Sequence, residues 1–205
     1  MIAALPVDRP ALVRRGLKLS YFTIAYNTME AVVAFTAGLV SGSVALVGFG
    51  VDSAIEVTSS GASQWRLRRD LNEERRHRVE AVTHRIIGWS FLVLALYVTF
   101  DGVRSLVTRE APDKSFLGIG ILSLSILVMP VLARAKRRVA LAMQSRALEA
   151  DAMQTSLCAY LSVIALAGVA LNTLLGWWWA DPIAALAMVP IIAKEGLEGV
   201  LAKPS

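Results

Sequence analysis

Two acidic residues, Asp52 and Glu56, interrupt an otherwise apolar stretch of the chain, GFGVDSAIEV. A spacing of four residues places both carboxylates on one face of a helix, with their Cβ atoms about 6 Å apart. Like charges so placed repel each other in a medium of low dielectric, and a proton or a divalent cation shared between them removes the repulsion. The pair therefore predicts proton or metal chemistry, and the structural alternative is a pair bonded to neighbouring helices.

A second group of polar residues lies in the stretch EADAMQTSLCAY, where Asp151, Gln154 and Cys158 follow one another at i, i+3 and i+7. This spacing aligns them along one stripe of a helix. Carboxylate and thiolate are ordinary zinc ligands, whereas an amide offers only a carbonyl oxygen. The stripe predicts the second half of a metal site, and the alternative for Cys158 is a small buried apolar residue.

Other polar residues in apolar surroundings have more than one interpretation. Asn27 and Glu30 lie one turn apart, and Asp101 lies near the end of another apolar run. Each could relay protons or hydrogen-bond between helices, and we favour the structural role for Asn27 and Asp101 while leaving Glu30 open. Asp181 precedes Pro182, a pair typical of a helix N-cap followed by its first residue.

The elements that must position these residues are membrane-spanning helices. The chain has 205 residues, of which 56% are hydrophobic, and its mean hydropathy is strongly positive. Six apolar runs are close in length to the about 20 residues that a helix needs to cross a bilayer. We expect an all-α integral membrane protein, a single domain over residues 1–205, because lipid satisfies backbone groups only through helices or a closed barrel. The predicted spans are about 17–40, 43–65, 84–108, 115–134, 147–175 and 178–200.

The basic residues alternate between the connections of these spans. The stretch WRLRRDLNEERRHRVEAVTHR follows the second span, and RAKRR (134–138) follows the fourth, whereas LVSGS and GWWWAD carry no Lys or Arg. The positive-inside rule therefore predicts that both termini lie in the cytoplasm. We expect the protein to reside in the cytoplasmic (inner) membrane. The net charge of +5 is explained by this topology, so we expect no nucleic-acid partner.

Taken together, three stretches resemble the membrane domain of the cation diffusion facilitator (cation efflux) family. They are SGSVALVGFGVDSAIEVTSS, RALEADAMQTSLCAYLSVIALAGVAL and WWWADPIAAL, and the resemblance covers most of the chain. Transferred residue by residue, the second-span pair of the family falls on Asp52 and Glu56. The fifth-span pair, usually His and Asp, falls on Gln154 and Cys158, and Asp151 matches the Asp of the family's Ala-Asp motif.

The resemblance implies an exporter of zinc or a related divalent ion in exchange for protons, working as a homodimer. Cadmium, cobalt, manganese or iron(II) are further candidate ions. In much of the family a C-terminal cytoplasmic domain supports dimerisation, and we expect this chain to be a short form without it, so that a dimer forms through spans and loops.

The leading hypothesis is therefore a divalent cation efflux transporter that binds one ion between spans two and five and exposes it to each side in turn. The ligands we expect are Asp52, Glu56 and Cys158, with either Asp151 or Gln154 as the fourth. The weak ligand Gln154 motivates a second hypothesis, a metal-binding membrane partner that does not transport. We do not expect an enzyme, because both histidines belong to the basic connection rather than the interior of a span, so neither is placed to activate a cysteine.

Overall fold

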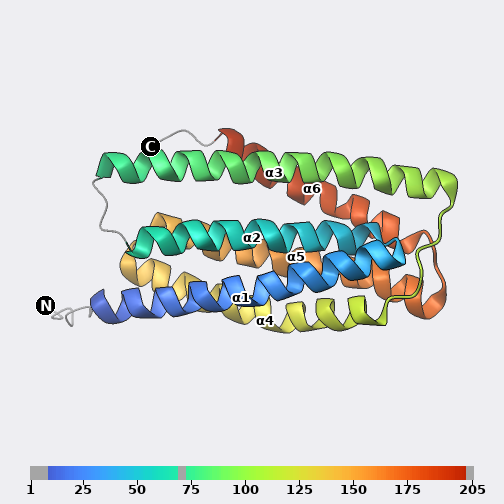
Figure 1. The fold of residues 1–205 in the computed structure, drawn as a ribbon, viewed down its shortest axis with the longest axis horizontal. Coiled ribbons are helices and arrows are strands. Elements are labelled where there is room, and N and C mark those ends of the chain that lie inside the picture. The colour runs from blue at the N-terminus through green and yellow to red at the C-terminus, as the bar shows by residue number, and fades with distance from the viewer. Residues whose placement is uncertain (1–8, 69–72, 202–205) are drawn as a thin grey trace, which may run out of the picture.

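The computed structural model describes residues 9–68 and 73–201, which form a bundle of long helices (Figure 1). These residues contain six α-helices and no strand, which confirms the predicted all-α class. Residues 69–72, part of the predicted basic connection, lie outside the described ranges. The helices are α1 (Arg9–Ser41), α2 (Val44–Arg68), α3 (Glu73–Thr108), α4 (Phe116–Met143), α5 (Arg146–Leu175) and α6 (Ala180–Leu201).

Four of the described helices, α1, α3, α4 and α5, are long and apolar enough to cross a membrane. The other two have charged residues within their apolar stretches, including the acidic pair on α2 and Lys194 and Glu195 on α6. Since α2 packs against α1, α3, α5 and α6, most of its polar side chains face other helices rather than lipid. The chain is thus an all-helical membrane protein.

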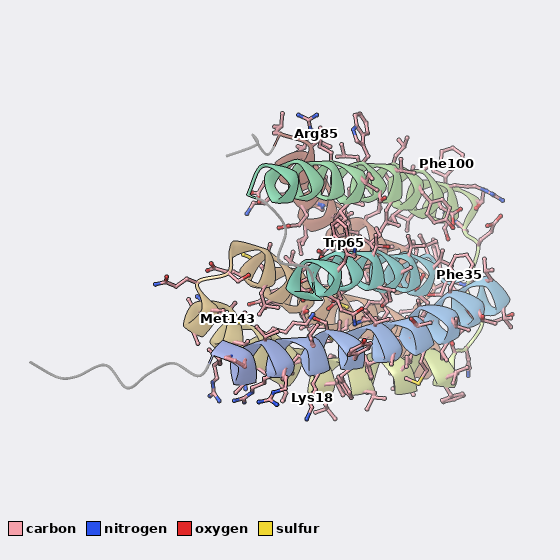
Figure 2. The ribbon with its side chains drawn as sticks, turned by 60° about the vertical axis from the view of Figure 1, so that its left-hand side comes forward. Lys18, Phe35, Trp65, Arg85, Phe100 and Met143 are labelled. Atoms are coloured by element: carbon pink, nitrogen blue, oxygen red, sulfur yellow. The ribbon has the colours of Figure 1, made fainter. Side chains whose placement is uncertain are left out.

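The helices run alternately in opposite directions along the long axis of the bundle (Figure 1). The closest pairs are α1 with α2, α4 with α5, and α3 with α6, while α2 and α5 pack together in the interior. Lys18, Arg85 and Met143 lie toward one end of the bundle (Figure 2). The tryptophan cluster between α5 and α6 lies at the opposite end, where the rings of Trp177 and Trp179 stack with centroids 5.3 Å apart. The predicted alternation of the connections is therefore seen, and the cytoplasmic position of the basic end stays a prediction.

The fourth helix is longer than the predicted span, and this changes the interpretation of the basic residues after it. We expected the span to end near residue 134 and a basic connection to follow. Instead α4 continues to Met143, and the connection consists of Gln144 in the left-handed conformation and Ser145, which caps α5. Lys136 is therefore a helical residue, and its side chain is completely buried.

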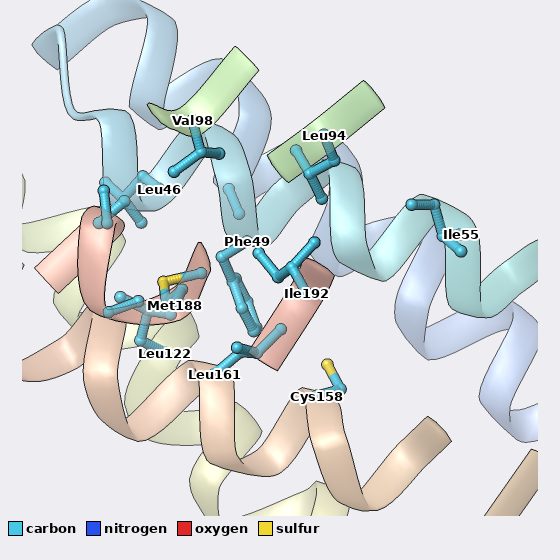
Figure 3. Close-up of a cluster of buried hydrophobic side chains, with 14 of the residues drawn as sticks. Leu46, Phe49, Ile55, Leu94, Val98, Leu122, Cys158, Leu161, Met188 and Ile192 are labelled. Carbon is cyan, nitrogen blue, oxygen red and sulfur yellow. The ribbon is translucent and has the colours of Figure 1, made fainter. Parts of the chain in front are cut away.

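The centre of the bundle is an apolar cluster to which all six described helices contribute side chains (Figure 3). Phe49 of α2, Leu161 of α5 and Ile192 of α6 belong to this cluster, and all three are almost fully buried. Cys158 lies at the edge of this cluster, with its thiol directed from α5 into the interior (Figure 3). Close packing of this cluster holds α2 and α5 at a defined relative depth and rotation.

Asp181 joins two helices rather than capping its own. Its carboxylate accepts hydrogen bonds from the Ser43 hydroxyl at 2.5 Å and from the backbone N–H groups of Val44 and Ala45 at 3.0 and 3.4 Å. The expectation that it is the N-cap of the last span was wrong, because α6 begins one residue earlier, at Ala180. An anion at the N-terminus of α2 satisfies N–H groups that have no partner in the helix, and it ties α2 to α6.

Two glycines allow backbones of paired helices to approach closely. A Cβ atom at Gly50 of α2 would lie 2.6 Å from the backbone nitrogen of Phe35 in α1. At Gly88 of α3, it would lie 2.6 Å from the backbone nitrogen of Val200 in α6. Small residues at such crossings are the usual way in which membrane helices gain van der Waals contact.

Candidate metal site

The acidic pair of α2 and the thiol of α5 meet in the interior of the bundle. The side chains of Asp52, Glu56 and Cys158 are 3%, 1% and 1% exposed. The thiol and both carboxylates are therefore enclosed by the bundle, on two helices that pack against each other. This placement follows from the packing of α2 against α5 and from the spacing of four residues that puts both acids on the same face of α2.

Glu30 of α1 lies beside these residues. Its side chain is completely buried, and its Oε2 accepts a hydrogen bond from the Ser53 hydroxyl at 3.0 Å. The same oxygen lies 4.0 Å from the Cys158 sulfur. The sequence left the role of Glu30 open, and the structure places a third carboxylate, from a third helix, next to the thiol.

Three carboxylate oxygens in this region are buried and have no hydrogen-bond partner among the described residues: Glu30 Oε1, Asp52 Oδ2 and Glu56 Oε2. A buried polar atom without a partner costs about 1–3 kcal/mol. Such groups are rare in folded proteins unless a ligand or ordered water meets them. Each free oxygen can bind a cation or carry a proton.

The other members of the predicted stripe lie in different surroundings. The Asp151 carboxylate is buried: Oδ1 accepts a hydrogen bond from the Ser60 hydroxyl at 2.7 Å, and Oδ2 forms an ion pair with the Lys136 Nζ at 3.0 Å. Gln154 is half-buried. A stripe of seven residues extends about 10 Å along a helix axis, so Asp151 lies at one end of it and Cys158 at the other.

The charged partner of Asp151 was not identified from the sequence. The sequence pattern places Lys136 in a basic connection, but its side chain is buried between α2 and α5 and also lies 3.7 Å from Glu56 Oε1. The burial of Lys136 could have been predicted from its spacing within α4, because it continues the helical periodicity of the buried residues Ser125, Met129 and Leu132.

In this structure, the described residues contain no group of three His, Cys, Asp or Glu side chains arranged to hold one metal ion. The site instead has two neighbouring parts. In one, carboxylate oxygens without a partner lie near the Cys158 thiol; in the other, Lys136 forms ion pairs with Asp151 and Glu56. Side-chain movement would have to precede tight coordination of an ion at this place.

Comparison with known proteins agrees with this description. The family described as "Cation efflux transmembrane domain" matches residues 20–201. Among curated relatives, "Transmembrane protein 163" of Xenopus laevis is 27% identical over 138 residues, covering 67% of this chain and 49% of that protein. "Magnetosome protein MamB" of Paramagnetospirillum magneticum (strain ATCC 700264 / AMB-1) is 29% identical over 169 residues, covering 78% of this chain and 56% of that protein. The chain spans about half the length of these two relatives.

Proposed function

The chain belongs to the cation efflux family, and on that premise we propose that it carries a divalent metal cation, zinc in the first place, across the membrane in exchange for protons. The observation that carries this proposal is the group of buried carboxylate oxygens without partners on α1 and α2 beside the thiol of α5. An ionisable group inside a membrane bundle is costly, and by default it indicates a functional site such as an ion or proton pathway.

The proposed ligands are Asp52, Glu56 and Cys158, with a fourth donor from α5, Asp151 or Gln154. The bonds of Asp151 to Lys136 and Ser60 argue against its recruitment, because both would have to be broken first. A thiolate favours softer ions, which supports zinc or cadmium over manganese; cobalt and iron(II) come between them.

Proton exchange follows from the chemistry of these donors. Carboxylates and a thiol bind metal in their deprotonated forms, so protons leave as the ion binds and return when it departs. The need for side-chain movement before coordination supports alternating access, in which one state binds the ion tightly and another releases it. We further propose a homodimer in the cytoplasmic membrane, with the basic end of the bundle in the cytoplasm.

A metal-binding membrane partner that does not transport is the second candidate. It is favoured by Gln154, a half-buried amide where the family usually has a stronger ligand. Such a protein would bind metal and leave it on the same side of the membrane.

Reconstitution into liposomes separates these functions. Uptake of zinc, cadmium, cobalt, manganese and iron(II) is measured with and without a pH gradient, for the wild type, Asp52→Ala and a control, Asp101→Ala. Asp101 is a matched acidic residue because it lies near the end of α3, where the Tyr97 hydroxyl donates to it. We expect gradient-dependent uptake that Asp52→Ala abolishes and Asp101→Ala preserves. Metal binding without uptake would favour the partner protein, and full uptake by Asp52→Ala would refute the proposed ligand set.

A further inference from the structure

A buried ammonium group lies next to the proposed ligand Glu56. Lys136 is 0% exposed, and its Nζ lies 3.0 Å from Asp151 Oδ2 and 3.7 Å from Glu56 Oε1. It also donates hydrogen bonds to the hydroxyls of Ser60 at 3.1 Å and Thr155 at 2.9 Å. Since a buried charge is tolerated only when it is paired and hydrogen-bonded, these partners account for a lysine inside a membrane bundle.

This network holds one oxygen of Glu56 and leaves the other free. The Thr155 hydroxyl donates to Glu56 Oε1 at 2.6 Å, while the same hydroxyl accepts from Lys136. The second oxygen, Oε2, is buried without a partner. A glutamate carboxylate can rotate about its terminal torsion, and anchoring one oxygen removes that freedom and sets the direction of the other.

We propose that Lys136, Thr155 and Asp151 form an anchor that positions the Glu56 carboxylate, so that its free oxygen is presented to the transported cation. This inference rests on the proposed function and deepens it. Lys136 and Thr155 are positioning residues that act through Glu56, and Asp151 orients Lys136 instead of binding the ion. The two ends of the stripe on α5 then have different roles: Cys158 binds the cation, and Asp151 belongs to the anchor.

Two other roles for Lys136 make different predictions. If the ammonium competed with the metal for Glu56, its removal would strengthen binding. If it served only to balance the charge of Asp151, removing both charges together would leave binding unchanged. The anchor predicts weaker binding in both cases, because Glu56 Oε1 loses the ammonium beside it and the Thr155 hydroxyl loses the donor that directs it toward Glu56.

The experiment measures cadmium affinity of the purified full chain in detergent, by competition with a fluorescent chelator. Thr155→Val removes the hydroxyl that donates to Glu56 and keeps the shape of the side chain. We expect affinity to fall about 10–100-fold, the usual cost of losing a group that orients a metal ligand. Thr173→Val is the matched control, because Thr173 is a buried threonine of the same helix that accepts from the Ser115 N–H, and it should leave affinity unchanged.

The double variant Lys136→Met/Asp151→Asn tests the anchor without leaving one charge unpaired, and so guards against a single variant that fails to fold. We expect a loss of affinity similar to that of Thr155→Val. Wild-type affinity in both variants would overturn the inference, and so would tighter binding in the double variant.

Cobalt spectra add a readout that a merely structural role would not change. At saturating cobalt, Thr155→Val should keep the thiolate-to-cobalt charge-transfer band of Cys158, while its d–d bands weaken as water replaces Glu56. Spectra identical to those of the wild type would contradict the anchor. If the wild type bound neither cadmium nor cobalt, the proposed function itself would fail, which differs from a wild type that binds metal and variants that bind it equally well.

Discussion

Replacing Asp181 by alanine should separate the N-terminus of α2 from α6. The carboxylate accepts three hydrogen bonds, from the Ser43 hydroxyl and the N–H groups of Val44 and Ala45, and its side chain is completely buried. The alanine variant removes all three at once and also removes an anion from the N-terminus of a helix.

The structure sets the size of the effect. A hydrogen bond to a charged group contributes about 1.5–3 kcal/mol, and two of the three bonds here are short, at 2.5 and 3.0 Å, while the third is 3.4 Å. Allowing for a Ser43 hydroxyl that finds another acceptor, we expect Asp181→Ala to lower the free energy of unfolding by about 3–5 kcal/mol. Asp181→Asn keeps one acceptor oxygen and loses the charge, and should cost about 1–2 kcal/mol.

The assay is unfolding of the purified protein in mixed micelles with increasing dodecyl sulfate, followed by helical circular dichroism. Ile183→Ala is the control, because this side chain lies on the same helix and is exposed. If Asp181→Ala is destabilised no more than Ile183→Ala, the bonds between α6 and the start of α2 contribute little, and the argument from the buried carboxylate is refuted. The order alanine, asparagine, wild type is expected in both stability and cadmium affinity, because α2 also carries the proposed ligands.

Three further predictions concern the site and the packing of the helices. Cys158→Ser should lower cadmium affinity more than manganese affinity in parallel chelator competitions, because the thiolate is the soft donor; an equal effect on both ions would exclude the thiol from the coordination. Glu30→Gln should weaken cadmium binding about tenfold by removing a nearby negative charge, and unchanged affinity would assign Glu30 a structural role. Gly88→Ala should lower the free energy of unfolding by about 1–3 kcal/mol, because the new Cβ would meet the backbone of α6. Gly120→Ala is its control, since that position has open space, and it should be neutral or stabilising; equal effects of the two substitutions would contradict the close contact of α3 with α6.

The helical class and the position of the acidic pair on one helix face could be predicted from local pattern. Apolar runs of span length predict helices because the backbone has no other partner in lipid. Spacing within one helix places Asp52 and Glu56 on the same face whatever the rest of the fold does. The boundary of α4 was predicted less well, because the polar residues 134–138 continue the helix where a membrane pattern alone suggests an end.

Contacts between helices were decided only by the tertiary structure. Periodicity identifies a buried face but does not specify which helix covers it, so Lys136 could not be assigned to Asp151 and Glu56, nor Asp181 to the N-terminus of α2. These partners are 15 residues or more apart along the chain, and they meet because close packing sets the rotation and depth of each helix. The amino-acid sequence by itself thus determined which residues are costly to bury, and the packing of the six described helices determined which of them are paired and which carboxylate oxygens have no hydrogen-bond partner among the described residues.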